Sequence, residues 1–173
     1  MNPKDLAKIK KGKLDLRCAD LRYTDLQDAN LRGADLRGAN LKNADLQGAN
    51  MSGAMAGDAD LSGSNMSNTD LSGANLVKTN LSCTTLKKAI LTDATLHGTN
   101  LIFADLSNAN LKGADLQCAR LVKTDLQGAN LTSSNMTGTT LWKANLSGTN
   151  LSGADLTNAN LRDTVYDKNT RGL

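Results

Sequence analysis

Large apolar residues recur at every fifth position of the chain, from Leu16 to Leu161. This series of 30 positions holds 26 Leu, three Met and one Ala, which is Ala56. A second series, from Ala19 to Thr164, holds Ala, Ser or Thr at all 30 of its positions. A period of five residues is neither the roughly 3.6-residue period of an α-helix nor the two-residue period of a simple strand. The pattern therefore predicts a repeat protein with one small structural unit for every five residues.

Within each unit the small residue and the large apolar residue are two positions apart, so in an extended chain they share one face. The residue between them is Asp or Asn in 24 of the 30 units and points to the other face. Two positions after the large residue stands Gly, Asn or Asp in 20 of the 30 units, which is the chemistry of a turn. Each unit is thus predicted to be a very short strand followed by a corner. Repetition gives a solenoid with Leu and the small residues inside, whose stacked coils pair as parallel strands about 4.8 Å apart.

The composition disfavours several other classes of protein. Aromatic residues make up 2% of the 173 residues, Glu is absent and Pro occurs once. A helical domain normally uses Glu heavily, and a sandwich or Rossmann domain needs aromatic and β-branched bulk. With 39% apolar residues and a net charge of +3, disorder is disfavoured as well. No run approaches the ~18 apolar residues of a membrane span and no secretory signal is found, so we expect a cytoplasmic protein.

The unit also resembles a known family. Runs such as residues 29–36, Ala-Asn-Leu-Arg-Gly-Ala-Asp-Leu, resemble the A(D/N)LXX motif of pentapeptide-repeat proteins, most of all the small cyanobacterial members. The resemblance covers roughly residues 14–166, and it implies an all-β fold: a right-handed quadrilateral (four-sided) parallel β-helix with four repeats in each coil. The five-residue period by itself does not distinguish three sides from four. Thirty repeats would make about 7.5 coils and a rod about 36 Å long.

The ends of a solenoid expose its core and unpaired backbone, so we expect a cap at each end. Residues 3–12 suit a short N-terminal helix, and the segment after Thr164 is not repetitive. There, Val165 and Tyr166 would plug the last coil or meet a second molecule. The predicted regions are an N-terminal cap, the pentapeptide-repeat β-helix and a C-terminal cap or tail: residues 1–13, 14–164 and 165–173.

One position interrupts the series of large apolar residues. Ala56 leaves a gap in the column of inward side chains, and Met55 replaces the usual Asp or Asn just before it. Because Met adapts to irregular spaces, we expect a local bulge in which Met55 folds inward.

No set of residues for catalysis, cofactor binding or metal binding is found, so we expect a protein that is not an enzyme and holds no cofactor. The three cysteines occupy outward positions too far apart for a disulfide, which indicates a reducing compartment: Cys18, Cys83 and Cys118. The single histidine, His97, neighbours Cys118, but a flat wall offers neither a pocket nor a third group to orient it. Stacked carboxylates such as Asp15 and Asp35 make calcium binding conceivable, yet nearby Arg side chains are expected to neutralise them.

The basic residues are unevenly spread, because residues 1–42 hold ten of the twenty Lys and Arg. A basic end suits nucleic acid or an acidic partner, but no aromatic residues interleave it for base stacking, so nucleic acid is not expected. The resemblance implies an alternative function, since some members of the family mimic DNA and bind DNA gyrase. Those rods are acidic, whereas this chain has a pI of about 8.8, which disfavours DNA mimicry.

One outward feature breaks the polar pattern. Ile102, Val122 and Trp142 each follow an inward Leu and are 20 positions apart, which is one coil of a four-sided solenoid. We predict that these three residues form an exposed apolar column about 10 Å tall, the apolar ladder, with Phe103 at its edge. The ladder is either an interaction surface or a brace between coils. The main hypothesis is therefore a non-catalytic protein-binding or scaffold module, whose partner is another protein or a second copy bound at the C-terminal end or the ladder.

Overall fold

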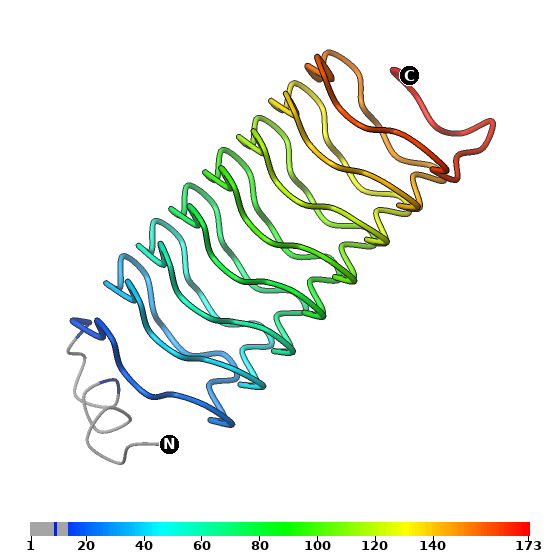
Figure 1. Ribbon diagram of the computed structural model, residues 1–173. Helices are drawn as coiled ribbons and strands as arrows, with labels where there is room; N and C mark the ends of the chain where they lie inside the picture. The colour runs from blue at the N-terminus through cyan, green and yellow to red at the C-terminus, as the bar shows by residue number, and fades with distance from the viewer. Residues whose placement is uncertain (1–8, 10–13) are drawn as a thin grey trace.

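The computed structural model describes Ile9 and residues 14–173, which form a rod of stacked coils (Figure 1). Every backbone bridge from Asp15↔Asp35 to Asn145↔Val165 is parallel and joins residues 20 positions apart. Four units therefore make one coil, as the family resemblance implies. In the described part of the chain the bridges are isolated single residues, and no strand or helix of several residues occurs. The sides are this short because a corner follows every unit.

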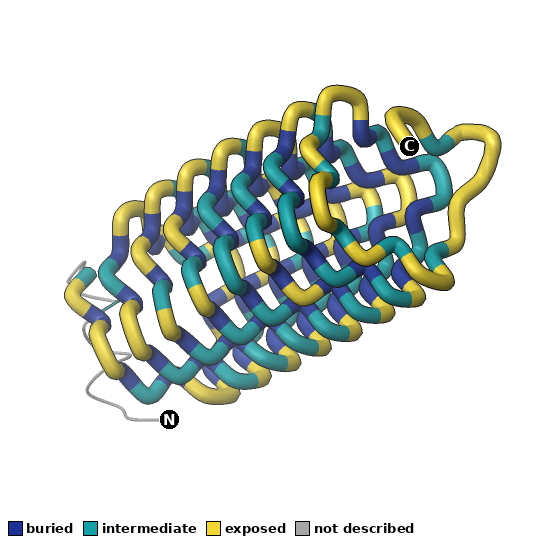
Figure 2. Tube along the Cα trace, turned by 45° about the horizontal axis from the view of Figure 1, so that its top comes forward, coloured by how far each residue is buried: buried dark blue, intermediate teal, exposed yellow. Residues whose placement is uncertain are grey.

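The series of large apolar residues lines the inside of the coils, as its period predicts. Every member from Leu16 to Leu151 is buried, and nearly all of the small series is buried beside it (Figure 2). Full burial of a Leu or Met side chain is worth roughly 1.5–3 kcal/mol, so the repeated Leu explains how such a short unit keeps its shape. Burial decreases toward the C-terminal end, where Leu156 and Leu161 are half-buried.

Ten Ser and Thr residues of the small series are buried, and each hydroxyl donates a hydrogen bond to the carbonyl of a large apolar position. In one geometry the acceptor lies three residues earlier, as from Thr24 to Leu21 O at 2.6 Å. In the other it lies 23 residues earlier, in the preceding coil, as from Thr99 to Leu76 O at 2.8 Å. Hydroxyls are tolerated inside the rod because the backbone supplies an acceptor for each.

The corner residues, two positions after each large apolar residue, all have positive φ, between 52° and 71°. Twelve of the thirty are Gly, and the others include Cys18, Lys88 and Phe103. Each corner is a four-residue turn, closed for example by the hydrogen bond from Ala19 N–H to Leu16 O at 3.0 Å. The third residue of such a turn favours Gly or Asn, so the predicted turn chemistry is confirmed, and the other side chains at this position are strained.

The outward Asp or Asn of each unit completes its corner, a role that the pattern alone did not reveal. In all 24 units that carry Asp or Asn, its side-chain oxygen accepts the backbone N–H two positions further on, at 2.9–3.4 Å. Asn100, for instance, accepts the N–H of Ile102. Within the described coils this N–H forms no backbone hydrogen bond, so the side chain satisfies it.

The expectation of a bulge at Ala56 is wrong. Met55 keeps its place among the bridges, with Asp35 on one side and Asn75 on the other, and the Ala56 N–H donates to Asn75 O at 2.8 Å. The Met55 side chain is 38% exposed, while Ala56 is buried. Because hydrogen bonds to both neighbouring coils hold this register, Met55 does not turn inward to replace the missing side chain.

The two ends of the rod are described to different extents. The expected helical cap, residues 1–13, lies outside the described residues except for Ile9, which packs half-buried against the core. At the other end, Val165 and Arg171 still pair with the preceding coil. Val165 and Tyr166 are 58% and 64% exposed, so they do not plug the last coil as expected. No helix among the described residues is long and apolar enough to cross a membrane.

Candidate functional site

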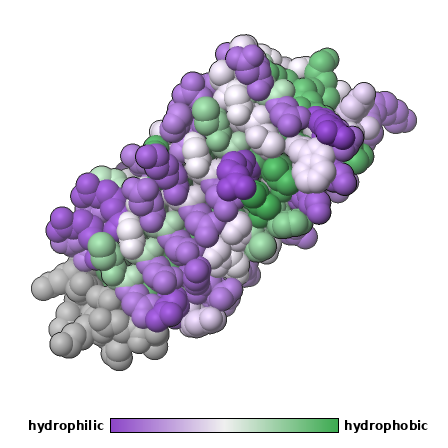
Figure 3. All heavy atoms as spheres, viewed as in Figure 1, coloured by the Kyte–Doolittle hydropathy of each residue, from purple (hydrophilic) through white to green (hydrophobic). Residues whose placement is uncertain are grey.

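Ile102, Val122 and Trp142 lie on successive coils of one wall, which we call the ladder wall and which consists of residues 20–23 and their counterparts at 20-residue intervals. Backbone hydrogen bonds set the register: Phe103 N–H donates to Val122 O at 3.1 Å, and Lys123 N–H donates to Trp142 O at 2.9 Å. All three residues of the ladder are half-buried, so the column is less exposed than predicted. The structure thus brings them together as one column. Hydrophobic side chains also gather in a patch on the C-terminal half of the face seen in Figure 3, among hydrophilic ones.

Both aromatic rings of this region lie under a lysine. Phe103 is 55% exposed, and Lys123 Nζ is 5.1 Å from the centre of its ring. Lys143 Nζ is 4.7 Å from the centre of the Trp142 ring, and the indole N–H donates to Asp163 Oδ2 at 2.9 Å. Cation–π contacts of this kind are worth about 0.5–1 kcal/mol at exposed sites. The lysine and the aspartate together hold the Trp142 ring in one orientation.

Cations without acidic partners lie beside the ladder. In the part of the chain that the structure describes, Arg120, Lys123 and Lys143 have no carboxylate oxygen within 4.0 Å. Arg162, at the end of the same wall, is 3.7 Å from Asp163, the acceptor of the indole N–H. Sequence reasoning missed this group, although a signal existed: Lys123 and Lys143 each directly follow a ladder residue and are themselves 20 positions apart.

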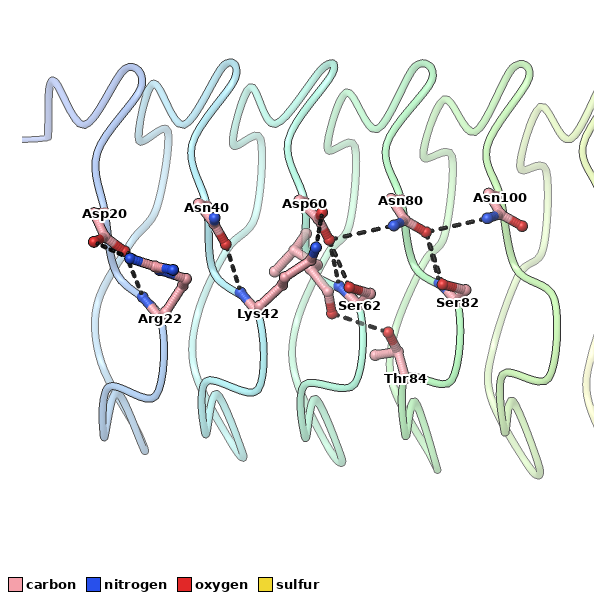
Figure 4. Close-up of polar contacts among 11 residues, drawn as sticks. Asp20, Arg22, Asn40, Lys42, Asp60, Ser62, Asn80, Ser82, Thr84 and Asn100 are labelled. Atoms are coloured by element: carbon pink, nitrogen blue, oxygen red, sulfur yellow. Dashed lines mark hydrogen bonds and ion pairs between the residues drawn. The ribbon is translucent and has the colours of Figure 1, made fainter. Parts of the chain in front are cut away.

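The N-terminal half of the ladder wall is different (Figure 4). There the cations are paired, Arg22 with Asp20 at 2.8 Å and Lys42 with Asp60 at 3.0 Å. Further along, two amide side chains donate to the side chain one coil earlier: Asn80 and Asn100. These polar groups of the N-terminal half satisfy one another, so the half that carries the ladder differs in its stacked apolar column and in its cations without carboxylate partners.

Arginines neutralise the acidic column at the N-terminal end, as expected for Asp15 and Asp35. Arg17 contacts both carboxylates, at 2.8 Å and 3.7 Å, and Arg37 lies 2.6 Å from Asp35. The hydrogen bond from Arg37 lowers the pKa of Asp35 below its ordinary value. Several of the basic residues in the described N-terminal coils are therefore paired within the rod itself.

The other candidate groups are dispersed. The cysteines are free and exposed at three separate corners: Cys18, Cys83 and Cys118. His97 is half-buried. Among the described residues, no three His, Cys, Asp or Glu side chains lie close enough together to hold a metal ion.

Two hollows lie near the C-terminal segment, and sequence reasoning found neither. An apolar hollow of about 500 Å³ at the end of the rod is lined by Leu161, Thr164, Tyr166 and Leu173. A polar hollow of about 380 Å³ has among its lining residues Lys87, Asp125, Gln127 and Asp167. Both depend on how residues 165–173, which leave the repeat, fold back along the last coils.

Inward Leu, positive-φ corners and 20-residue coils define a four-sided β-solenoid built from five-residue repeats. A profile of pentapeptide repeats matches the chain in eight copies, over residues 15–53, 57–93, 89–128 and 124–163. The chain belongs to the pentapeptide-repeat family, which confirms the resemblance noted in the sequence. A comparison with curated protein sequences gives no match.

Two solved structures are similar to this chain. HetL, a pentapeptide repeat protein involved in heterocyst differentiation regulation in the cyanobacterium Nostoc sp. strain PCC 7120, is 32% identical, with a TM-score of 0.67. That match covers 87% of this chain and 78% of HetL. Full-length QnrB1, a plasmid-mediated fluoroquinolone resistance protein, is 14% identical with a TM-score of 0.51 over 87% of this chain and 94% of QnrB1, which shows the fold alone. Both support the right-handed quadrilateral β-helix.

Proposed function

We propose that this chain is a non-catalytic binding module that contacts another protein through the apolar ladder and Phe103. The main support is the stack of Ile102, Val122 and Trp142 on one wall, beside the exposed ring of Phe103. Interface cores are enriched in aromatic residues and Arg and depleted of acidic residues, which is the composition of the ladder and its borders. Apolar area removed from water contributes about 25 cal/mol per Å², so covering the column and the exposed Phe103 ring would favour binding.

The similarity to HetL fits this function. HetL is involved in the regulation of a differentiation process. A rigid rod with one distinctive wall regulates through contact with other macromolecules. This similarity supports a protein as the partner of this chain.

The test is capture of partners with a ladder variant. The double variant Val122→Ser with Trp142→Ser removes apolar area from the ladder without changing an inward residue. The matched control, Lys112→Ser with Thr132→Ser, alters the equivalent position two units earlier in the chain, on the opposite wall. Proteins captured from a lysate of the source organism, quantified by mass spectrometry, are expected to fall at least tenfold for the ladder variant and to be unchanged for the control.

The rival interpretation makes the ladder a brace between coils. It expects the double variant to lower the urea midpoint of unfolding while the captured proteins stay the same. That pair of results would remove the ladder as a binding surface. Measuring the unfolding midpoint of each variant beside the capture experiment separates the two interpretations.

The alternative function, a DNA mimic that binds DNA gyrase or another topoisomerase, has less support. DNA mimicry requires a surface dominated by unpaired carboxylates, whereas the described acidic residues pair with cations at several places, such as Asp60 with Lys42 and Asp105 with Lys87. A gyrase supercoiling assay decides the matter. Inhibition or protection at micromolar concentration would favour the mimic, and no effect would eliminate it.

Two further features bear on the cellular compartment of the protein and on its self-association. Three exposed free thiols suit a reducing compartment such as the cytoplasm. The apolar hollow at the C-terminal end suits contact with a second copy, since it lies against the half-buried Leu161. Sedimentation velocity over a range of concentrations, with Tyr166→Asp as the comparison, measures that association.

A further inference from the structure

We propose that the partner bound by the ladder is an amphipathic α-helix whose apolar stripe is flanked by Asp or Glu. This inference rests on the proposed function and specifies the chemistry of the partner. It draws on three observations: the spacing of the ladder, the pairing of the backbone behind it, and the unpaired cations at its borders.

The spacing of the ladder matches a helix better than a strand. Parallel coils stack about 4.8 Å apart, so the three side chains lie at about 0, 4.8 and 9.6 Å along the rod. A helix rises about 1.5 Å per residue, so residues i, i+3 and i+7 lie at about 0, 4.5 and 10.5 Å. Alternate residues of an extended strand lie about 6.6–6.8 Å apart, which loses register with the ladder at the second step. A helix parallel to the rod axis can therefore place one apolar residue beside each ladder residue.

The backbone of the ladder wall is already paired, so a partner strand cannot add to it. Arg120 N–H donates to Thr99 O at 2.9 Å, and Lys123 N–H donates to Trp142 O at 2.9 Å. Leu121 N–H donates to Thr140 O at 2.8 Å. The wall can therefore contact a partner only through side chains, as a groove or flat face does when it binds a helix.

The charges around the ladder select an acidic partner. Arg120 precedes Leu121 on the wall, and Lys123 and Lys143 lie at its corner, each exposed. None has a carboxylate within ion-pair distance in the described coils, in contrast to Arg22 and Lys42 on the same wall. Acidic side chains on both sides of an apolar stripe would meet these cations.

The carboxylates nearest to this region have contacts of their own. Asp163 accepts the Trp142 indole N–H and lies near Arg162. On the adjoining wall, Asp105 pairs with Lys87 at 3.2 Å, and Asp125 accepts the side-chain amide of Asn145 at 3.0 Å. These aspartates are therefore engaged elsewhere. Arg120, Lys123 and Lys143 have no carboxylate partner in the described coils, and Lys123 and Lys143 lie over aromatic rings, where an acidic partner would reach them.

The test uses three synthetic helical peptides of 18 residues without Trp. The acidic peptide has Leu at i, i+3, i+4 and i+7 spacing with Glu on both sides of the stripe. The basic peptide carries Lys in place of Glu, and the scrambled peptide has the acidic composition with Leu dispersed around the helix. Trp142, the single Trp, reports binding through its fluorescence, and calorimetry measures affinity independently.

We expect saturable binding of the acidic peptide to the wild-type protein, with at least tenfold weaker binding of the other two peptides, a factor equal to about 1.4 kcal/mol. The double variant Lys123→Glu with Lys143→Glu should weaken binding of the acidic peptide at least tenfold. Lys112→Glu, on the opposite wall, should leave that binding unchanged. Raising the ionic strength from 0.05 to 0.5 M should weaken binding of the acidic peptide, because salt screens exposed charges.

Equal binding of the acidic and basic peptides would overturn the charge assignment, and equal binding of the acidic and scrambled peptides would overturn the helical stripe. These comparisons use the wild-type protein, so they do not depend on the folding of a variant. If the acidic peptide fails to bind while the ladder variant still loses its captured proteins, the helix is wrong and the proposed binding function stands. If the ladder variant captures the same proteins as wild type, the proposed function itself fails.

Discussion

The corner of each unit permits a test of the fold that does not disturb the core. Gly33 is a corner residue with φ of 64°, and a Cβ added there would have no atom within 4 Å. Gly57 lies one position before a corner, its φ is outside the left-handed region, and a Cβ added there would contact Val77 O at an ordinary 3.5 Å. Gly33→Ala and Gly57→Ala therefore make the same chemical change without a clash, and they differ in the backbone conformation that the new side chain must adopt.

The expected effects have opposite signs. A residue with a Cβ loses roughly 1–2 kcal/mol in the left-handed conformation. Replacing Gly by Ala also reduces the freedom of the unfolded chain, which stabilises the folded state by about 0.4–1 kcal/mol where the conformation is compatible. From the mid-values of about 1.5 and 0.7 kcal/mol, Gly33→Ala should therefore lower the free energy of unfolding by roughly 0.8 kcal/mol, and Gly57→Ala should raise it by about 0.4–1 kcal/mol.

Urea unfolding followed by circular dichroism measures both changes. With a denaturant dependence of about 1–3 kcal/mol per M, the two midpoints should move in opposite directions by a few tenths of a molar or more. The reasoning is refuted if Gly33→Ala leaves the midpoint unchanged, or if Gly57→Ala lowers it as much as Gly33→Ala does. Either result would mean that positive φ at the corners does not limit the choice of residue.

Four other changes test the inside of the rod and its C-terminal end. Leu86→Ala should lower the free energy of unfolding by about 2–5 kcal/mol, as other large-to-small core changes do, and an unmoved urea midpoint would contradict the inward position of Leu86. Ala56→Leu should raise the urea midpoint, because it restores the large apolar side chain that the series lacks there. Thr99→Val should cost about 1 kcal/mol of unfolding free energy, measured in the same way, because it removes the hydrogen bond to the preceding coil. Hydrogen bonds from the Gly148 and Asn169 amides lower the pKa of Asp167, so its contribution to stability is complete above its unfolded pKa of about 3.9 and disappears as pH falls through the lower folded value. Acidification from pH 6 to pH 2 should therefore lower the thermal midpoint of unfolding more in wild type than in Asp167→Asn. Equal decreases of the midpoint would show that Asp167 does not hold the C-terminal segment, residues 165–173, in place.

Much of the candidate site followed from spacing alone. Ile102, Val122 and Trp142 are 20 positions apart, so any four-sided coil stacks them, and the structure does. The ion pairs around these residues could not be predicted from the spacing. Arg22 and Lys123 belong to the same wall, yet Arg22 has a carboxylate partner and Lys123 lies over the Phe103 ring instead. Side chains of this length choose among neighbours on two coils, and a one-dimensional pattern does not rank those neighbours.

The sequence by itself determined which residues face inward. From Leu16 to Leu151 a large apolar side chain returns every five residues, except at Ala56, and a solenoid with this period buries them all. The tertiary structure decided what depends on contact between coils. Hydrogen bonds such as Leu16 N–H to Asp35 O make the coil four-sided. Similar hydrogen bonds hold Lys88 at a positive φ that its residue type disfavours, and keep Met55 outside although the inward residue beside it, Ala56, is small. Burial follows local periodicity, whereas these features depend on partners about 20 residues away, and stacked backbone hydrogen bonds outweigh the preference of any single side chain.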